Sequence, residues 1–341
     1  MKQPILGVTM GDPAGVGPEI IARAAAEAGV RSASRPVVVG AASTMSAALA
    51  LVSSPLTLHA VKRVADCRWA DGTLEVLDLA NVDMATLPRG AVSAAAGRAA
   101  YDYVERAVAL AQAREIHAIV TAPINKEALA AAGMPHTGHT EILARLSNTA
   151  DFAMLLMGRE LRVIHVTTHV ALRRVPDLVT RERVLKTIRL AQRTMQGLGR
   201  SQARIAVAGL NPHAGEDGLF GDEEKTAIVP AIEAARAEGM TVIGPLPADT
   251  LFSRARGGEF DIVVAMYHDQ GHIPVKTVGF TYDDASKKWT GLSGVNVTVG
   301  LPFLRVSVDH GTAFDRAWKG IANPESMIEA IDVAVRMLAA T

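Results

Sequence analysis

Residues 5–20, ILGVTMGDPAGVGPEI, join a short apolar run to a glycine-rich turn that leads into an alanine-rich stretch. The run is hydrophobic at nearly every position, which is typical of a strand buried on both faces of a sheet. Similar runs alternate with longer helical segments, and they occupy residues 36–40, 74–79, 118–122, 162–168, 204–210, 241–246, 261–267, 294–301 and 304–309. This alternation predicts an α/β fold.

The glycine-rich turn would let backbone amides at a helix N-terminus approach an anion or a cofactor. It does not match the G-x-G-x-x-G pattern of dinucleotide-binding proteins, because Ile20 follows Gly15 and Gly17 where that pattern has its third glycine. A simple turn between strand and helix explains the segment equally well.

The length of 341 residues suffices for two domains or for one large α/β unit. No linker or shift in composition marks a border, so we expect a second domain inserted within the first. The first α/β/α domain is predicted to comprise residues 1–130 and 300–341, and the second residues 131–299. Residues 281–293, TYDDASKKWTGLS, are polar and rich in turn formers, and they are expected to form an exposed loop.

The chain carries 35 Lys and Arg residues and 35 Asp and Glu residues, so its formal net charge is zero. A neutral chain has no long-range field that attracts nucleic acid or an anionic membrane. No apolar run approaches the ~20 residues of a membrane span, and the first residues lack the apolar stretch of an export signal. The single Cys67 has no partner for a disulfide bond. We therefore expect a cytoplasmic protein that binds neither nucleic acid nor membranes.

Three histidines share one sequence context, because His169, His213 and His268 each follow the end of a predicted strand. Ligands bind at the carboxyl ends of strands in open α/β sheets, so three imidazoles there can converge on one divalent ion and leave a position for substrate. Any one of them alone would more often be a hydrogen-bonded structural residue. Together they favour a shared metal site.

Acidic residues close to these histidines are candidates for further ligands, bases or hydrogen-bond partners of the ligands; they are Glu216, Asp217 and Asp269. Solvated loop charge is the simpler interpretation of Glu216 and Asp217. Asp249 follows another predicted strand and is either a helix cap or a catalytic group.

A second group of residues has the chemistry of an anion-binding pocket. His139 and Thr140 begin a predicted helix, while Lys276, Asn296 and Arg305 flank predicted strand ends. A lysine, an arginine and a helix N-terminus supply the donors that a phosphate or a carboxylate needs. Thr140 is explained equally well as an N-cap, and scattered basic residues are usually solvated.

The chain contains, in order, the segments GDPAGVGPE, TAPINKEAL, GHTE, TTH, GLNPHAGE, YHDQGHIPVK, GVNVTVGLPF and SVDHGTAFD. Over nearly the whole chain these segments resemble the 4-hydroxythreonine-4-phosphate dehydrogenase family of NAD-dependent enzymes. The resemblance implies two α/β/α domains of the isocitrate and isopropylmalate dehydrogenase type, with the active site in the cleft between them.

The resemblance also implies roles for individual residues. It implies that His169, His213 and His268 bind a divalent metal ion shared between the subunits of a homodimer. It also implies that the phosphate and hydroxyl groups of the substrate are contacted by His139, Thr140, Lys276, Asn296 and Arg305. Residues 310–324 are similar to the nucleotide-binding loop of the isocitrate dehydrogenase type, which implies NAD contacts for His310, Thr312 and Asp315.

The expected mechanism follows from the metal. An ion held by three imidazoles would lower the pKa of a substrate hydroxyl and promote hydride transfer to NAD. The same ion would stabilise the enolate formed as carbon dioxide leaves the β-keto acid. Three nitrogen ligands favour zinc, cobalt or manganese over magnesium, although the family accepts several divalent ions. The general base is not identified by the sequence.

Two features bear on the substrate. His272 and Ile273 precede Pro274, and residues 281–293 lengthen the connection to the next strand. Both resemble a catabolic branch that oxidises 4-phospho-D-threonate or 4-phospho-D-erythronate, while 4-hydroxythreonine 4-phosphate stays open. An alternative is a cyclohexadiene-diol dicarboxylate of terephthalate breakdown, whose second carboxylate would replace the phosphate. A metal-dependent hydrolase that uses the same histidines is the alternative from another class.

Overall fold

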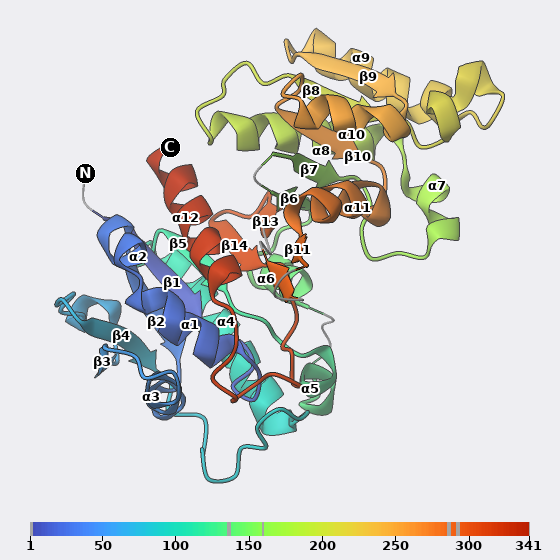
Figure 1. Ribbon diagram of the computed structural model, residues 1–341. Coiled ribbons are helices and arrows are strands. Elements are labelled where there is room, and N and C mark those ends of the chain that lie inside the picture. Colours follow the sequence, from blue (N-terminus) through green and yellow to red (C-terminus); the bar gives the residue numbers. More distant parts are fainter. Residues whose placement is uncertain (1–2, 135–137, 159, 285–287, 291–293, 341) are drawn as a thin grey trace. The chain divides into compact units, whose positions relative to one another are not determined.

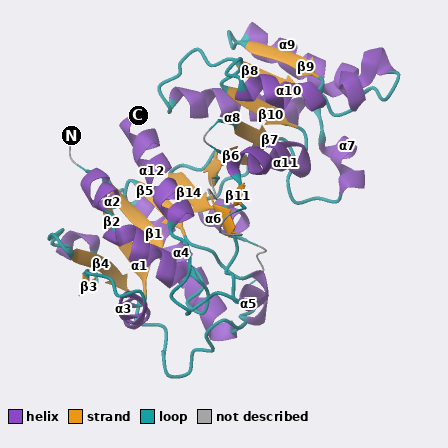
Figure 2. Cartoon of the chain, in the orientation of Figure 1, coloured by secondary structure: helices purple, strands orange, loops and turns teal. Residues whose placement is uncertain are grey.

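The computed structural model describes residues 3–134, 138–158, 160–284, 288–290 and 294–340. The chain divides into two compact units (Figure 1): unit 1 comprises Met1–Ala150 and Leu301–Leu338, and unit 2 comprises Asp151–Gly300 with residues 339–341. Figure 2 shows strands flanked by helices in each unit. The predicted α/β class is therefore confirmed.

Unit 1 is built on a parallel sheet. Its strands lie in the order β3-β4-β2-β1-β5-β14, and each hydrogen-bonded pair is parallel. The strands are β1 (Ile5–Thr9), β2 (Arg35–Gly40), β3 (Thr57–Val61), β4 (Thr73–Asp78), β5 (Ala118–Thr121) and β14 (Leu304–Val308). The central strands are buried on both faces, which explains why their sequences are apolar throughout rather than alternating.

The helices of unit 1 connect these strands. They are α1 (Gly17–Ala26), α2 (Ala28–Ala33), α3 (Ala42–Leu51), α4 (Ala94–Gln112), α5 (Lys126–Ala131), α6 (His139–Leu146) and α12 (Glu325–Ala339), together with the short 3-10 helix η1 (Val64–Asp66). Helix α12 begins after Asn323, whose side-chain oxygen accepts the backbone N–H of Glu325 at 3.0 Å.

Unit 2 is built on a mixed sheet with the strand order β13-β6-β7-β10-β8-β9. Strands β7, β10, β8 and β9 run parallel, while β6 is antiparallel to both of its neighbours. The strands are β6 (Ala153–Met157), β7 (Arg162–His165), β8 (Ile205–Ala208), β9 (Val242–Leu246), β10 (Ile262–Ala265) and β13 (Val295–Val299).

The remaining elements of unit 2 surround this sheet. Its helices are α7 (Val175–Leu178), α8 (Arg181–Gln196), α9 (Val229–Ala237), α10 (Ala248–Arg256) and α11 (His268–Gly279). Tighter or wider turns are the 3-10 segments η2 (Leu172–Arg174) and η3 (Pro212–Gly218) and the π-helical turn η4 (Glu224–Ile228).

Two expectations from the sequence need correction. The border between the units lies at 150/151 rather than 130/131, because α6 packs on α4 and Gln112 donates its side-chain N–H to the carbonyl of Leu146 at 3.3 Å. The stretch 281–293, expected to be a loop, contains the antiparallel strands β11 (Thr281–Asp283) and β12 (Lys288–Thr290). Residues 285–287 and 291–293 of this stretch lie outside the described residues.

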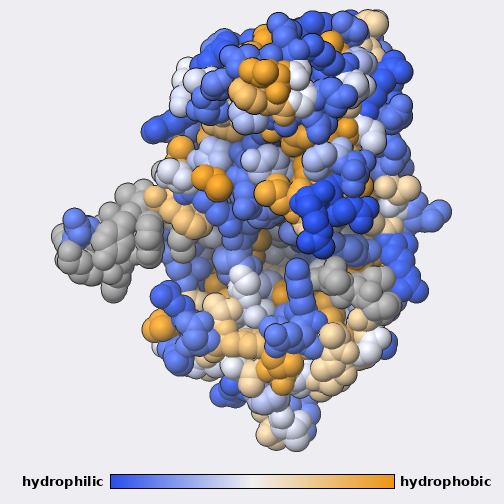
Figure 3. Space-filling model, turned by 90° about the vertical axis from the view of Figure 1, so that its right-hand side faces the viewer, coloured by the Kyte–Doolittle hydropathy of each residue, from blue (hydrophilic) through white to orange (hydrophobic). Residues whose placement is uncertain are grey.

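The face of the molecule drawn in Figure 3 is largely hydrophilic, with hydrophobic residues scattered over it. Most large apolar side chains are buried in the two units. Within the described part of the chain, no helix is both long enough and apolar enough to cross a bilayer.

Candidate functional site

The three predicted metal ligands follow neighbouring parallel strands of unit 2. His169 lies after β7, His268 after β10 and His213 after β8, and these strands stand in the order β7-β10-β8. Parallel strands present their carboxyl ends at one edge of a sheet, where α/β proteins bind ligands.

Two of these histidines lie side by side. The ring centroids of His169 and His268 are 5.6 Å apart, with 42° between the ring planes. Two imidazoles that bind one tetrahedral ion through nitrogen at ~2.1 Å have their centroids about 5 Å apart. The pair therefore fits a shared metal ion.

The neighbouring carboxylate sets the orientation of the His268 ring. Nδ1 of His268 lies 2.7 Å from a carboxylate oxygen of Asp269. Since an ionised carboxylate only accepts, Nδ1 carries the proton, and Nε2 of the neutral ring keeps the lone pair that a metal needs. Asp269, left open in the sequence as a ligand, a base or a partner of one, is thus a hydrogen-bond partner of a candidate ligand.

His213 lies apart from this pair. It begins a run of left-handed backbone, residues 213–217, and its own φ is 53°. Its ring faces Phe220 with centroids 6.3 Å apart, and Nδ1 is 3.6 Å from a carboxylate oxygen of Glu216. Among the residues that the structure describes, no three His, Cys, Asp or Glu side chains are gathered as a metal site. The third ligand therefore stays a prediction.

Glu224, which the sequence reasoning missed, anchors the segment before His213. Its buried carboxylate accepts the backbone N–H groups of Leu210 and Asn211 at 2.7 and 2.8 Å and the side-chain amide of Asn211 at 2.9 Å. The only available signal was a carboxylate a short distance after a strand end, and sequence spacing does not show that it folds back onto the strand.

In unit 1, Arg305 places a buried cation on β14. Its side chain is 3% exposed, and Nη2 donates to the hydroxyl of Thr121, at the end of β5, at 2.7 Å. Burial lowers the pKa of this guanidinium to about 9, and the charge of Glu141 opposes that shift. A buried guanidinium is a strong binder of phosphate or carboxylate.

His139 shares this environment at the start of α6. Burial, and then the charge of Arg305, hold the pKa of His139 well below its usual value, so the ring is neutral. Its buried Nε2 has no hydrogen-bond partner among the described residues. Thr140 lies in the first turn of α6 and is not its N-cap, because that position belongs to Gly138.

The other two predicted substrate residues belong to unit 2. Asn296 is in β13, paired with Leu156 of β6. Lys276 lies in the last turn of α11, with Nζ 6.0 Å from the ring centroid of Phe280. The expectation that Lys276 flanks a strand end is wrong, because helix α11 extends to Gly279.

The predicted cofactor residues lie on a segment that packs against the opening loop of unit 1. The carbonyl of Thr312 accepts the N–H of Val16 at 3.0 Å, and the indole of Trp318 donates to the carbonyl of Pro13 at 3.0 Å. Thr312 is buried, while His310 and Asp315 are exposed. The two glycine-containing loops are thus held together by hydrogen bonds within unit 1.

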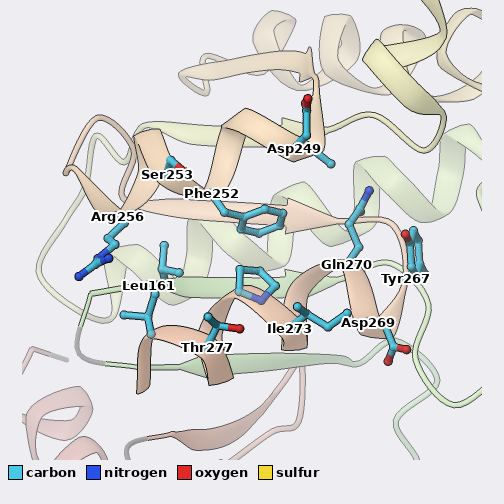
Figure 4. Close-up of a pocket in the computed structure, with 13 residues that line it drawn as sticks. Leu161, Asp249, Phe252, Ser253, Arg256, Tyr267, Asp269, Gln270, Ile273 and Thr277 are labelled. Carbon is cyan, nitrogen blue, oxygen red and sulfur yellow. The ribbon is translucent and has the colours of Figure 1, made fainter. Parts of the chain in front are cut away.

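A cavity of about 460 Å³ lies between α10 and α11 of unit 2 (Figure 4). Apolar side chains such as Phe252 and Leu161 line most of it, and Asp249 stands at its rim. Asp249 is in the first turn of α10 and makes no capping hydrogen bond, since Pro247 is the N-cap residue. Asp269, the hydrogen-bond partner of His268, also lines this cavity, whereas the three predicted metal-ligand histidines and the predicted substrate and cofactor residues do not.

Comparisons with known proteins agree with the fold. The family model described as pyridoxal phosphate biosynthetic protein PdxA matches residues 32–334. A D-threonate 4-phosphate dehydrogenase of Pectobacterium atrosepticum is 50% identical over 334 residues, covering 98% of this chain and 99% of the relative.

Solved structures give the same picture. A 4-hydroxythreonine-4-phosphate dehydrogenase from Klebsiella pneumoniae is 46% identical with a TM-score of 0.88, covering 99% of this chain and 98% of that one. A terephthalate 1,2-cis-dihydrodiol dehydrogenase from Burkholderia xenovorans is 31% identical with a TM-score of 0.68, covering 98% of each chain.

The relatives define the class of protein: this chain is an oxidoreductase that acts on a CH–OH group. The chain belongs to the PdxA family. The resemblance noted in the sequence motifs is thereby confirmed, and the alternative of a metal-dependent hydrolase has no support from these relatives.

Proposed function

We propose that this chain catalyses the NAD-dependent oxidation of the secondary alcohol in a phosphorylated four-carbon hydroxy acid, followed by loss of carbon dioxide from the β-keto acid. The observation that carries the proposal is the pair of imidazoles, His169 and His268, at the ends of neighbouring parallel strands. The pair lies in a chain whose relatives are dehydrogenases named for phosphorylated acids.

His169 and His268 would hold a divalent metal ion, with His213 as the predicted third ligand. Zinc, cobalt and manganese suit imidazole ligands better than magnesium does. The ion would supply the Lewis-acid chemistry needed for deprotonation of the alcohol and for decarboxylation. Asp269 holds the proton on Nδ1 of His268 and so keeps Nε2 available as a ligand.

NAD would accept the hydride. The proposed contacts are His310, Thr312 and Asp315 of unit 1. The hydrogen bond from Val16 to Thr312 fixes this segment on the opening loop and leaves His310 and Asp315 exposed to a ligand.

The phosphate would be bound by cationic and neutral donors. In unit 1, Arg305 offers a buried positive charge, and burial keeps the His139 ring beside it neutral. Thr140 is the third candidate of unit 1, and Lys276 and Asn296 are the candidates of unit 2. Binding energy at this remote group positions the reacting carbon against the nicotinamide.

The candidate substrates are 4-phospho-D-threonate, 4-phospho-D-erythronate and 4-hydroxythreonine 4-phosphate. The 50% identical relative is named for the first type of acid. The terephthalate dihydrodiol dehydrogenase, at 31% identity, favours a cyclic diol dicarboxylate as the second candidate.

NADH formation tests the proposal. The enzyme is incubated with NAD, with zinc, cobalt or manganese, and with each phosphorylated acid, its dephosphorylated form or the cyclic diol dicarboxylate. Metal-dependent NADH formation with one phosphorylated acid and little with its dephosphorylated form is the expected result. NADH formation with the cyclic diol dicarboxylate alone would favour the second candidate, and no turnover of any of these acids would contradict both.

A homodimer with a metal site shared between subunits is also proposed. Because His169 and His268 lie together in one chain while His213 lies apart, His213 is the candidate for a ligand from the partner subunit. Mixtures of inactive His213→Ala and His169→Ala chains should then recover activity in hybrid dimers. Confirmed hybrid dimers without activity would contradict sharing.

A cytoplasmic location is proposed as well, supported by the single half-buried Cys67.

A further inference from the structure

Four histidine rings of unit 2 form a continuous row, of which the proposed metal site uses only one end. His169 lies 5.6 Å from His268, as described above. The ring of His268 stacks on that of His272, with centroids 3.7 Å apart and 9° between the planes. His272 in turn lies 4.7 Å from His165. The sequence singled out His272, and the proposed function gives it no role.

The stacking arises from the spacing of the two residues on α11. His268 begins the helix and His272 follows one turn later, so both side chains lie on the same face. Nδ1 of His272 donates to the backbone carbonyl of His268 at 3.0 Å. Because a carbonyl only accepts, this bond fixes the proton on Nδ1 and holds the ring parallel to that of His268. The His272 side chain is 5% exposed, so packing restricts it further.

The ring of His165 packs against that of His272. It lies at the end of β7, is fully buried, and donates from Nδ1 to the carbonyl of Met154 at 3.1 Å. Helix α11 reaches this ring only because residue 271 is glycine: a Cβ there would stand 2.3 Å from Nε2 of His165. Burial lowers the pKa of His165 to about 3, so the ring packs in its neutral form.

We propose that His272 is a positioning residue for the metal site: its stacked ring holds the His268 imidazole in the orientation that faces His169. The inference rests on the proposed function, because it assigns His268 to the metal. A ligand already held in its binding orientation loses little freedom when the ion arrives, and removal of such supporting groups commonly weakens metal binding 10- to 100-fold.

Titration with Co²⁺ tests this role directly, since the visible absorption of Co²⁺ reports both affinity and ligand geometry. The titration compares the metal-free full-length protein with His272→Leu, His272→Phe and His272→Gln. Leucine removes the ring and the hydrogen bond, phenylalanine keeps only an aromatic ring, and glutamine keeps only a donor. Ile273→Ala is the matched control on the same helix, because Ile273 is 62% exposed.

His272→Leu is expected to raise the Co²⁺ dissociation constant 10- to 100-fold and to alter the spectrum. The Co²⁺ dissociation constant of His272→Phe should stay within about fivefold of the wild-type value, because this variant loses only one neutral hydrogen bond. Ile273→Ala should bind Co²⁺ as the wild type does. Thermal unfolding checks that each variant is folded, and if His272→Leu is not, the comparison of His272→Phe with His272→Gln decides.

Wild-type affinity and spectrum in a folded His272→Leu protein would overturn the positioning role and leave the proposed function intact. Equal losses in His272→Phe and His272→Gln would overturn ring stacking as its basis. A wild-type protein that binds no Co²⁺ would refute the metal assignment, and the role of His272 with it.

Discussion

Replacing Asp12 with asparagine is expected to raise the stability of unit 1 relative to the wild type as the pH increases. Asp12 follows β1, and its side chain is fully buried. Oδ1 accepts the backbone N–H of Ala14 at 2.8 Å, whereas Oδ2 has no hydrogen-bond partner among the described residues. Burial raises the pKa of the carboxyl group from 3.8 to about 6, and the bond from Ala14 offsets only part of that rise.

The magnitude follows from proton linkage. With a pKa of about 6 in the folded protein and 3.8 in the unfolded chain, the ionised carboxyl group costs the folded state about 3 kcal/mol above pH 6. The cost vanishes once both states are protonated, below about pH 3. Between these values stability falls as pH rises, because the folded state binds more protons than the unfolded chain. At about pH 5 roughly half of the cost is present.

Urea unfolding followed by circular dichroism measures this effect. The Asp12→Asn variant keeps the oxygen that accepts from Ala14 and cannot ionise. Its free energy of unfolding relative to wild type should therefore increase by about 1.4 kcal/mol between about pH 5 and pH 7.5. Asp71→Asn, at an exposed position, serves as the control and should show no such increase. A constant difference for Asp12→Asn would show that the buried carboxyl group is already ionised at pH 5, and would refute the reasoning.

Three further predictions concern the candidate site. Arg305→Ala should lower kcat/KM for a phosphorylated acid by about one to two powers of ten, because charge-assisted hydrogen bonds contribute ~1.5 to 3 kcal/mol, and the loss should shrink with the dephosphorylated acid; equal losses with both would contradict phosphate binding. Chelation should abolish NADH formation, zinc, cobalt or manganese should restore it, and His213→Ala should lower the bound metal measured by atomic emission; unchanged metal content would remove this ligand. Glu224→Gln should lower the free energy of unfolding by about 2 kcal/mol in urea titrations, since the buried carboxylate accepts three hydrogen bonds from Leu210 and Asn211; unchanged stability would contradict the anchoring role.

Strands that carry local signals could be predicted from the sequence. The apolar runs at 36–40 and 261–267 correspond to β2 and β10, whose residues are buried on both faces. Strands β3, β6, β11 and β12 had no such signal. β6, Ala153–Met157, consists of alanine, leucine and methionine, which favour helices, and it is a strand because β13 and β7 pair with it on both sides. β3, Thr57–Val61, is an edge strand in which only Val61 is buried, so it lacks a continuous apolar run.

The candidate site divides in the same way. The sequence showed that His169, His213 and His268 each follow the end of a strand. In the structure these strands are neighbours in the order β7-β10-β8, so the three residues follow the same edge of the sheet. The supporting groups could not be predicted, because they depend on tertiary contacts. Asp269 and His272 contact the His268 ring because of the way helix α11 is oriented. Glu224 contacts the segment after β8 because the chain folds back onto the end of that strand.

Helix α11 fixes the distance between the candidate metal ligand and the candidate phosphate-binding lysine. His268, His272 and Lys276 recur every four residues, so they follow one face of the helix from its first turn to its last. At 1.5 Å per residue, the backbone positions of the candidate metal ligand and the candidate phosphate-binding lysine are about 12 Å apart along the axis. The His272 ring occupies the turn between them and rests on the fully buried His165. A single helix, which lies against His165 of the sheet at Gly271, therefore carries the candidate metal ligand at one end and the candidate phosphate-binding lysine at the other.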